Sequence, residues 1–217
     1  MSLLNENLYP ITSRFAFIQT NINDVVEEFL NWKTPLVAAH NNSFVKLLPA
    51  KDLKSTLLSL CPLTVVELRR FLFIPTKNNW TMILDSSHMG TDRTIPEVLS
   101  EFLHAHMIYV AIGPYGNLFE MYNSGNLVRF IGVAKEGKWK FYDEGIRQDF
   151  EKTEFYTKRI IKERLTSAMI VEYLRHFEID LSDNSLDAYS AILVSKKGPM
   201  FNATKELSLI EAQNFFR

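Results

Sequence analysis

The chain has 217 residues, of which 24 are Lys or Arg and 25 are Asp or Glu, so its formal net charge is -1. Hydrophobic residues make up 47% and charged residues 23%, a balance that excludes a disordered chain, a collagen-like repeat and a strongly basic nucleic-acid binder. Its single cysteine, Cys61, cannot form an intramolecular disulfide, which fits a reducing, cytoplasmic setting.

The first part of the chain is predicted to alternate strands and short helices. Residues 14–19 alternate apolar and polar side chains as a half-buried strand does. Residues 24–32 carry apolar side chains at helical spacing, and Asp24 with Glu27 has the spacing of a capping box. The next expected elements are a strand at 44–48, a helix at 51–60, and a hairpin of strands at 70–74 and 80–84.

A further helix start is indicated by Thr94 and Glu97, which have the spacing of a second capping box. Pro96 suits the first turn, because no intrahelical hydrogen bond is lost there. We expect this helix to include His104 and to end at His106. Near a helix C-terminus the dipole favours imidazole groups, so this pair is interpreted as structural rather than metal-binding.

The middle of the chain predicts an antiparallel meander. Four apolar segments are joined by short connections that contain glycine. Glycine suits such turns because it adopts positive φ angles without strain. The expected strands lie at 107–112, 118–122, 128–134 and 138–142.

The last part of the chain is predicted to be mainly helical. Apolar side chains at helical spacing predict helices at 151–165 and 167–177. We therefore expect one α+β domain over residues 1–217, a mainly antiparallel sheet with helices packed on it, and a weak subdivision near residue 146. The remaining expected elements are a strand at 189–195 and a helix that is capped by Ser208 and Glu211 and ends near Phe216.

The most polar segment, residues 85–93, connects an expected strand to an expected helix. Asp85, His88 and Asp92 could converge on a divalent metal ion, because carboxylate and imidazole groups bind several such ions. Alternatively, His88 could serve as a general base beside a serine nucleophile at position 86 or 87. The same residue types also satisfy backbone groups in a strand-to-helix connection, and we favour this structural interpretation.

If this loop is functional, we expect binding rather than catalysis. The candidate binding residues are Asp85, His88, Asp92 and Arg93, together with Trp80 of the preceding strand. The chain has no P-loop, dinucleotide-binding glycine motif, zinc-protease helix or nucleophile elbow. We therefore expect no cofactor and no resident metal, and we favour a binding protein over an enzyme.

Other chemistry-bearing features have simpler interpretations. Cys61 has apolar neighbours and is expected to be a buried structural thiol. The basic residues of 158–164 lie among glutamates, which is typical of a solvated, salt-bridged face. The strand aromatics are expected to pack in the core, so we expect no nucleic-acid partner. No apolar run approaches the roughly 20 residues that cross a bilayer, so we expect no membrane partner.

Residues 69–93 combine an apolar strand, a turn, a strand that starts at Trp80, and the run Gly90-Thr91-Asp92. This segment resembles uncharacterised bacterial proteins of about this size, and the resemblance extends loosely to residue 145. Some proteins of that kind are similar to the immunity partners of polymorphic toxins. The resemblance implies a bacterial accessory protein, and it provides no catalytic residues that could be assigned to positions of this chain.

Three functional hypotheses follow. The favoured one is a non-enzymatic binding protein of the immunity type, which acts on a protein partner. The alternative is a small-molecule or metal-dependent hydrolytic enzyme that uses Asp85, His88 and Asp92. A third is a regulatory domain whose sheet forms an apolar ligand pocket.

Overall fold

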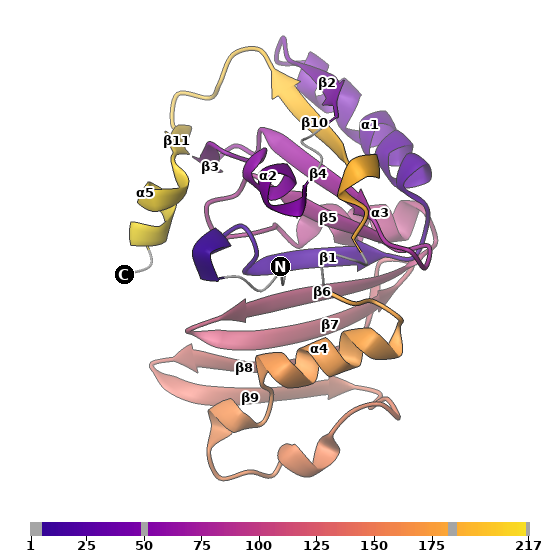
Figure 1. Ribbon diagram of the computed structural model, residues 1–217, viewed down its shortest axis with the longest axis vertical. Helices are drawn as coiled ribbons and strands as arrows, with labels where there is room; N and C mark the ends of the chain where they lie inside the picture. Colours follow the sequence, from indigo (N-terminus) through magenta and orange to yellow (C-terminus); the bar gives the residue numbers. More distant parts are fainter. Residues whose placement is uncertain (1–5, 49–51, 182–185, 216–217) are drawn as a thin grey trace.

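The computed structural model describes residues 6–48, 52–181 and 186–215. Within these ranges, nine strands form one antiparallel sheet with helices on both faces (Figure 1). This arrangement confirms the predicted α+β fold with a sheet of hairpins. In spatial order the strands are β2 (Ser43–Leu47), β10 (Ile192–Lys197), β4 (Arg70–Pro75), β5 (Thr81–Asp85), β1 (Arg14–Ile18), β6 (His106–Gly113), β7 (Gly116–Asn123), β8 (Asn126–Glu136) and β9 (Lys138–Gly145).

Helices, short 3-10 turns and a two-stranded ribbon surround this sheet. The ribbon pairs β3 (Leu63–Val65) with β11 (Lys205–Leu207). The helices are α1 (Ile22–Ala38), α2 (Leu53–Leu58), α3 (Thr94–Phe102), α4 (Ser167–His176) and α5 (Leu209–Asn214). The 3-10 turns are η1 (Glu6–Leu8), η2 (Thr153–Phe155), η3 (Ile161–Glu163) and η4 (Ala188–Ser190).

Side chains alternate between the two faces of the sheet and fill two separate cores. On β1, Phe15 and Phe17 pack into the core that α2 and α4 cover. Ala16 and Ile18 point the other way, into the core under α1 and α3. Because both faces of the central strands are covered, all five residues of β5 are buried.

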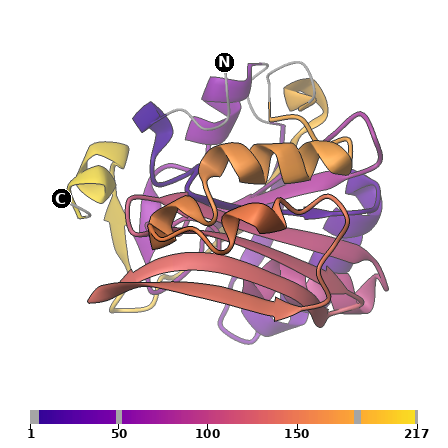
Figure 2. The same ribbon diagram turned by 90° about the horizontal axis from the view of Figure 1, so that it is seen from below.

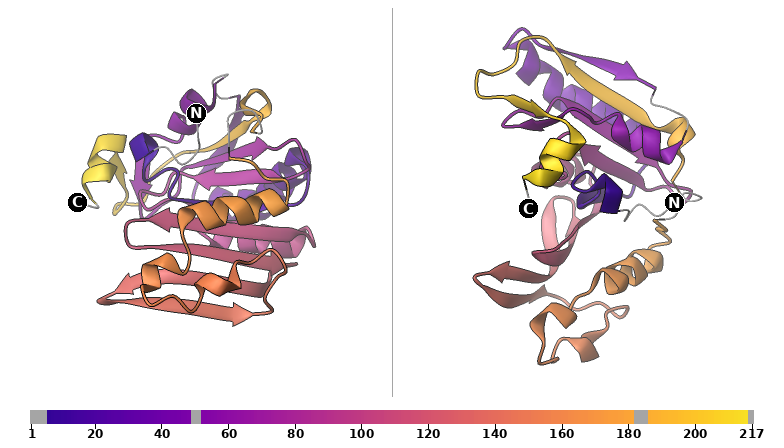
Figure 3. Two further views of the ribbon diagram at one scale, coloured as in Figure 1. Left: turned by 60° about the horizontal axis from the view of Figure 1, so that its bottom comes forward. Right: turned by 60° about the vertical axis from the view of Figure 1, so that its left-hand side comes forward.

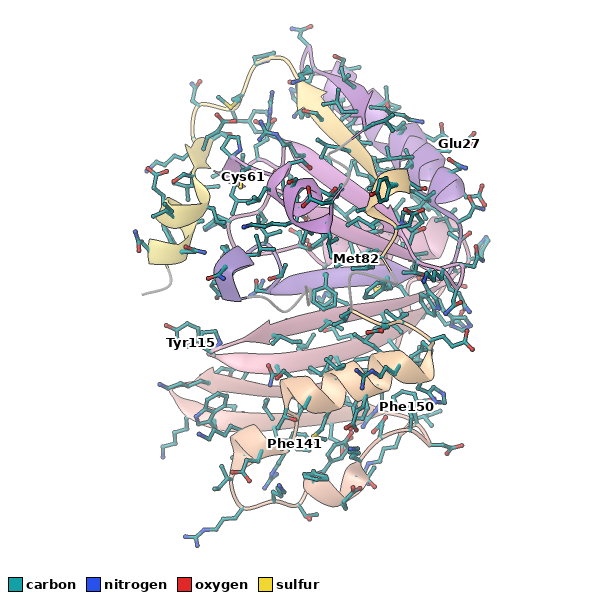
Figure 4. The ribbon with its side chains drawn as sticks, in the orientation of Figure 1. Glu27, Cys61, Met82, Tyr115, Phe141 and Phe150 are labelled. Carbon is teal, nitrogen blue, oxygen red and sulfur yellow. The ribbon has the colours of Figure 1, made fainter. Side chains whose placement is uncertain are left out.

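Aromatic side chains fill the space between α4 and the end of the sheet. Phe150 contacts Tyr173 of α4 with ring centroids 5.4 Å apart. Phe141 of β9 lies 5.2 Å from the ring of Tyr156. Figure 4 shows Phe141 and Phe150 on the side of β8 and β9 that α4 covers. This layer attaches α4 and the segment before it to one face of β7–β9.

On the opposite face, no helix of the described residues covers β8 and β9, and α3 reaches only the near part of β7. Helices α1 and α3 cover β1, β4, β5 and β6 on that side but do not extend across β8 and β9 (Figure 2). Of the three outer strands, β7 supplies one fully buried apolar side chain to the α1–α3 core, Tyr122. We call this side of β6–β9, which is covered only where α1 and α3 pack on β6 and Tyr122, the open face.

Two predicted helix starts differ from the observed ones. The N-cap of α1 is Asn21, whose side chain accepts hydrogen bonds from the backbone N–H groups of Asn23 and Asp24, so the expected box of Asp24 with Glu27 is wrong. At α3, Asp92 accepts from the backbone N–H of Thr94 at 2.8 Å, and Thr94 is already helical. The capping box of Ser208 with Glu211 is confirmed at α5.

The predicted helix at 151–165 is wrong, since this segment forms only the two short turns η2 and η3. Its apolar side chains do not share one face: Tyr156 is buried, whereas Ile160 is half exposed. Glu151, at the start of the segment, is drawn into the protein by an ion pair with Arg129 of β8. The buried side chains Glu151 and Tyr156 are not spaced as residues on one face of a helix are. A continuous amphipathic helix therefore does not form here.

The end of the chain returns to the sheet, where the strand predicted at 189–195 is observed as β10, Ile192–Lys197, directly after the turn η4. Strand β10 inserts between β2 and β4, and α5 then lies beside η1 (Figure 3). Gln213 of α5 donates a hydrogen bond to the carbonyl of Asn7 at 3.2 Å. Residue 51 of the expected helix at 51–60 and Phe216 lie outside the described residues. No helix in the described ranges is long and apolar enough to span a membrane.

Candidate functional site

The carboxylate of Asp85 is buried at the end of β5 and holds the following loop in place. One of its oxygens accepts the backbone N–H of Ser87 and the other accepts that of Asp92, each at 2.8 Å. Burial raises the pKa of Asp85 to about 7. The two hydrogen bonds act to lower this pKa, but their effect is smaller than that of burial. Both oxygens are therefore used to fix the path of residues 85–92.

The two candidate serine nucleophiles also hold backbone groups. The hydroxyl oxygen of Ser86 accepts from the backbone N–H groups of Arg69 and Arg70 at 3.0 and 3.1 Å. The hydroxyl oxygen of Ser87 accepts from the N–H of Met89 at 3.1 Å. These contacts tie the loop to itself and to the start of β4.

The remaining candidate residues point to different parts of the protein. His88 lies against the ring of Phe215 and has Nδ1 at 3.3 Å from the carbonyl of Thr64. Trp80 is buried at the other end of β5 and packs against Phe177. In the described part of the chain, no three His, Cys, Asp or Glu side chains are grouped so that they could hold a metal ion.

Arg93 is exposed and forms an ion pair with a buried carboxylate on the open face. Its Nη1 donates to Glu120 at 3.0 Å, and the hydroxyl of Tyr122 donates to the other oxygen of Glu120 at 2.9 Å. Burial raises the pKa of Glu120, while Tyr122 and Arg93 act to lower it. Arg93 is therefore engaged within the protein.

The two histidines and the cysteine that the sequence also singled out lie outside the loop at 85–93. His104 follows α3 with a positive φ of 49°, and His106 is the first residue of β6, so neither lies in the expected helix. Cys61 is half-buried, and burial raises its pKa although the nearby Arg70 acts to lower it. The fold brings Arg70 close to Cys61, which was expected to be buried among apolar neighbours.

A half-open cleft of about 480 Å³ lies on the open face, beside the loop at 85–93. Strand pairing places five residues in one row across its floor. Met89 of the loop also lines this cleft, which we call the Arg14 cleft. The row consists of Arg14 (β1), Ala111 (β6), Leu118 (β7), Gly132 (β8) and Tyr142 (β9).

Aromatic rings form two walls of the Arg14 cleft. On β8 and β9, the rings of Phe130 and Tyr142 stack with centroids 5.5 Å apart, next to the bare backbone of Gly132. At the other side, Tyr9 lies beside Gly113, while Tyr115 is at the tip of the β6–β7 hairpin and is 54% exposed (Figure 4). The cleft thus offers flat apolar surfaces at both ends.

Arg14 supplies the positive charge of the cleft. Its side chain is half-buried, and no hydrogen bond or ion pair of its guanidinium is found with any residue in the described ranges. The hydroxyl of Tyr9 is close to it: burial raises the pKa of Tyr9, Arg14 lowers it and Tyr115 raises it. A half-buried cation without a carboxylate partner is an incomplete arrangement, because burial costs a charge its hydration.

The loop at 85–93 sets the position of Arg14. Gly90 packs so closely on the start of β1 that a Cβ there would lie 2.6 Å from the hydroxyl oxygen of Ser13. The backbone N–H of Thr91 donates to the carbonyl of Arg14 at 3.3 Å. The loop that the sequence indicated therefore borders the cleft, although its polar side chains are used internally.

Sequence reasoning did not select Arg14, Phe130 or Tyr142. The available signal was the period-2 alternation of the strands, which places Phe130 on the face opposite to the buried Arg129 and Ile131. Arg14 gave no such signal, because it shares its face with the buried Ala16 and Ile18. The sequence predicted helices packed on the sheet but not which part of a face they leave uncovered. The register of nonadjacent strands was needed to bring Arg14 and Tyr142 into one row.

No family model, curated protein or solved structure matches this chain. The resemblance of residues 69–93 to immunity partners of toxins therefore stays a prediction. The Arg14 cleft combines one cation, four aromatic rings and a half-open apolar floor.

Proposed function

We propose that this chain is a non-enzymatic, cytoplasmic bacterial binding protein of the immunity type, which binds a protein partner through its open face. The observation that carries the proposal is the Arg14 cleft, which lies on the face of β8 and β9 that no described helix covers. An apolar and aromatic centre with charged residues at its rim is the composition of protein interfaces.

The rim of the cleft supports binding of a folded surface. Glu136 accepts hydrogen bonds from the amine of Lys140 and the hydroxyl of Tyr142, both at 2.7 Å, so its charge is balanced within the protein. Tyrosine and arginine are enriched among the residues that contribute most to protein binding. Arg14, Tyr115 and Tyr142 give the open face this character.

The loop at 85–93 gives little support to the hydrolase alternative. A general base or metal ligand must reach the substrate, whereas Asp85 is buried and binds two backbone N–H groups. The hydroxyls of Ser86 and Ser87 are occupied by backbone groups as well. Elemental analysis of the purified protein, with His88→Ala compared by thermal shift, tests this alternative, which a stoichiometric metal lost in the variant would revive.

Site-specific photo-crosslinking in the native cells tests the binding proposal. A photoreactive phenylalanine analogue is placed at Tyr115, beside the cleft, or at Tyr189, which is 75% exposed on η4 away from it. We expect one discrete crosslinked protein from position 115 and none from position 189. No crosslinked protein at position 115, or the same products at both positions, would refute the proposal.

A further inference from the structure

We propose that the Arg14 cleft binds an acidic side chain of the partner through the Arg14 guanidinium and an adjacent aromatic or apolar side chain of the partner on the Phe130–Tyr142 wall. This inference rests on the function proposed above and specifies the chemistry that the partner must present. Arg14 indicates the acidic side chain, and the Phe130–Tyr142 wall indicates the aromatic or apolar one.

The anionic half of the ligand follows from Arg14. A guanidinium presents two parallel N–H donors that match the two oxygens of a carboxylate. Of the described residues that line the cleft, Arg14 alone is basic, and one positive charge is balanced by one carboxylate. A phosphate group carries more charge and generally draws further donors, such as a helix N-terminus, which this cleft does not supply from its described residues.

The carboxylate that lines the cleft, Glu136, and the buried Glu120 have partners other than Arg14. Glu120 is bound by Arg93 and Tyr122, and Glu136 is bound by Lys140 and Tyr142. Arg14 is therefore left for an acidic group that comes from outside the chain. Burial has already removed part of the water that would hydrate the Arg14 guanidinium. A carboxylate that binds Arg14 therefore displaces less water from it than from an exposed arginine, so the desolvation cost of the new hydrogen bonds is smaller.

The apolar half of the ligand follows from the opposite end of the row. Gly132 has no side chain, so the ring of Phe130 lies over its backbone, 3.3 Å from where a Cβ would stand, and stacks on Tyr142 to form a flat wall beside Leu118. Another aromatic or apolar side chain can lie there against a ring edge or face. This wall gives a contact that a bare acidic group does not make.

The length of the row indicates two neighbouring residues rather than one small molecule. Arg14 and Tyr142 are four strands apart, which at about 4.8 Å per strand is about 19 Å between their Cα atoms. Even after both side chains extend inward, one acidic side chain does not fill this span. The cleft is also open along the sheet, whereas small-molecule sites enclose most of their ligand. The occupant is therefore a short stretch of a protein surface.

Titration with defined peptides tests the inference on the full chain. Acetyl-Phe-Glu-amide is added to the isotope-labelled protein and backbone amide shifts are followed by NMR, with acetyl-Phe-Gln-amide and acetyl-Ala-Glu-amide as matched probes. We expect shifts at Arg14, Leu118 and Gly132, and binding that weakens about tenfold when either the charge or the ring is removed.

The Arg14→Gln variant isolates the cation. We expect it to bind the Glu and Gln peptides equally, whereas Arg159→Gln, at an exposed arginine outside the cleft, binds as the parent does. Arg14→Lys keeps the positive charge but not the two parallel N–H donors. We expect its affinity for the Glu peptide to lie between that of the parent and that of Arg14→Gln. Equal binding of the Glu and Gln peptides by the parent, or unchanged binding by Arg14→Gln, would overturn the inference.

The crosslinking experiment separates this inference from the proposed function. A partner crosslinked at position 115 equally well in the parent and in Arg14→Gln refutes the carboxylate inference and leaves the binding function standing. Loss of the crosslink in Arg14→Gln but not in Arg159→Gln supports both. Binding of free phenylacetate as tight as that of the peptide, without any crosslinked partner, overturns both, since the ligand is then a small molecule.

Discussion

Arg129 and Glu151 form a two-point ion pair in which neither side chain is exposed to solvent. The Nε and Nη2 groups of Arg129 donate to the two oxygens of Glu151 at 2.7 and 2.8 Å, and Nη2 also donates to Asp143 at 2.7 Å. Glu151 further accepts from the hydroxyl of Tyr156 at 2.9 Å. This network joins β8 and β9 to the irregular segment that leads into α4.

Removing Glu151 should destabilise the protein strongly. We expect Glu151→Ala to lower the free energy of unfolding by about 3–5 kcal/mol, because Arg129 then stays buried with only part of its charge balanced. Urea unfolding followed by circular dichroism measures the change.

A matched surface pair provides the control. Lys158 and Glu163 are 3.6 Å apart and their side chains are 41% and 42% exposed. Glu163→Ala should change the free energy of unfolding by less than about 1 kcal/mol, because exposed ion pairs contribute little. Equal losses in the two variants would mean that the buried network does not hold the segment.

Asp85 should make the stability depend on pH. Its pKa is raised to about 7 in the folded protein, from an ordinary value of 3.8. Between these pH values the folded state keeps a proton that the unfolded chain has lost. The stabilising contribution is therefore full below about pH 4 and is lost as pH rises through 7, at about 1.4 kcal/mol per pH unit.

The Asp85→Asn variant measures this effect. It has no titrating group at position 85 and loses one of two backbone contacts, so we expect it to be less stable than the parent at pH 4. The difference between parent and variant should shrink steadily from pH 4 to pH 7 in urea unfolding. A difference that stays constant over this range would contradict the assigned pKa shift.

Gly125 should tolerate substitution less well than Gly137. Both have left-handed backbone, with φ of 77° and 72°, so an alanine at either costs about 1 kcal/mol or more. A Cβ at Gly125 would also lie 2.7 Å from Cβ of Glu101, whereas Gly137 faces open space. We expect Gly125→Ala to lose at least about 1 kcal/mol more than Gly137→Ala in thermal or urea unfolding.

Replacing Val66 should make the folded protein more stable. It has a φ of 76°, which is strained for a β-branched residue, and its side chain is 69% exposed, so little packing depends on it. Val66→Asn should raise the free energy of unfolding by about 1 kcal/mol, because asparagine adopts this conformation more readily.

The control for this gain is Val45→Asn, at a 40% exposed position with ordinary strand geometry in β2. We expect no stabilisation there, since asparagine is depleted in strands. If both variants are destabilised to the same extent, the backbone at Val66 is not strained.

The short-range patterns of the sequence were sufficient for much of the fold. The glycine-containing connections predicted the meander of β6–β9, and the spacing of Ser208 and Glu211 predicted the cap of α5. These features depend on residues within a few positions of one another. The helix predicted at 151–165 failed because Glu151 is held by Arg129, which lies 22 positions away.

The polar loop at 85–93 was likewise visible in the sequence, and its favoured structural interpretation agrees with the contacts of Asp85 and Ser86. What the sequence determined by itself was the alternation of each strand and thus which side chains share a face. The tertiary structure decided which face stays uncovered, and it brought Arg14 of β1 into line with Tyr142 of β9 across three intervening strands. Such a row depends on strand order and register, which are determined by the summed packing of both cores and not by any local pattern.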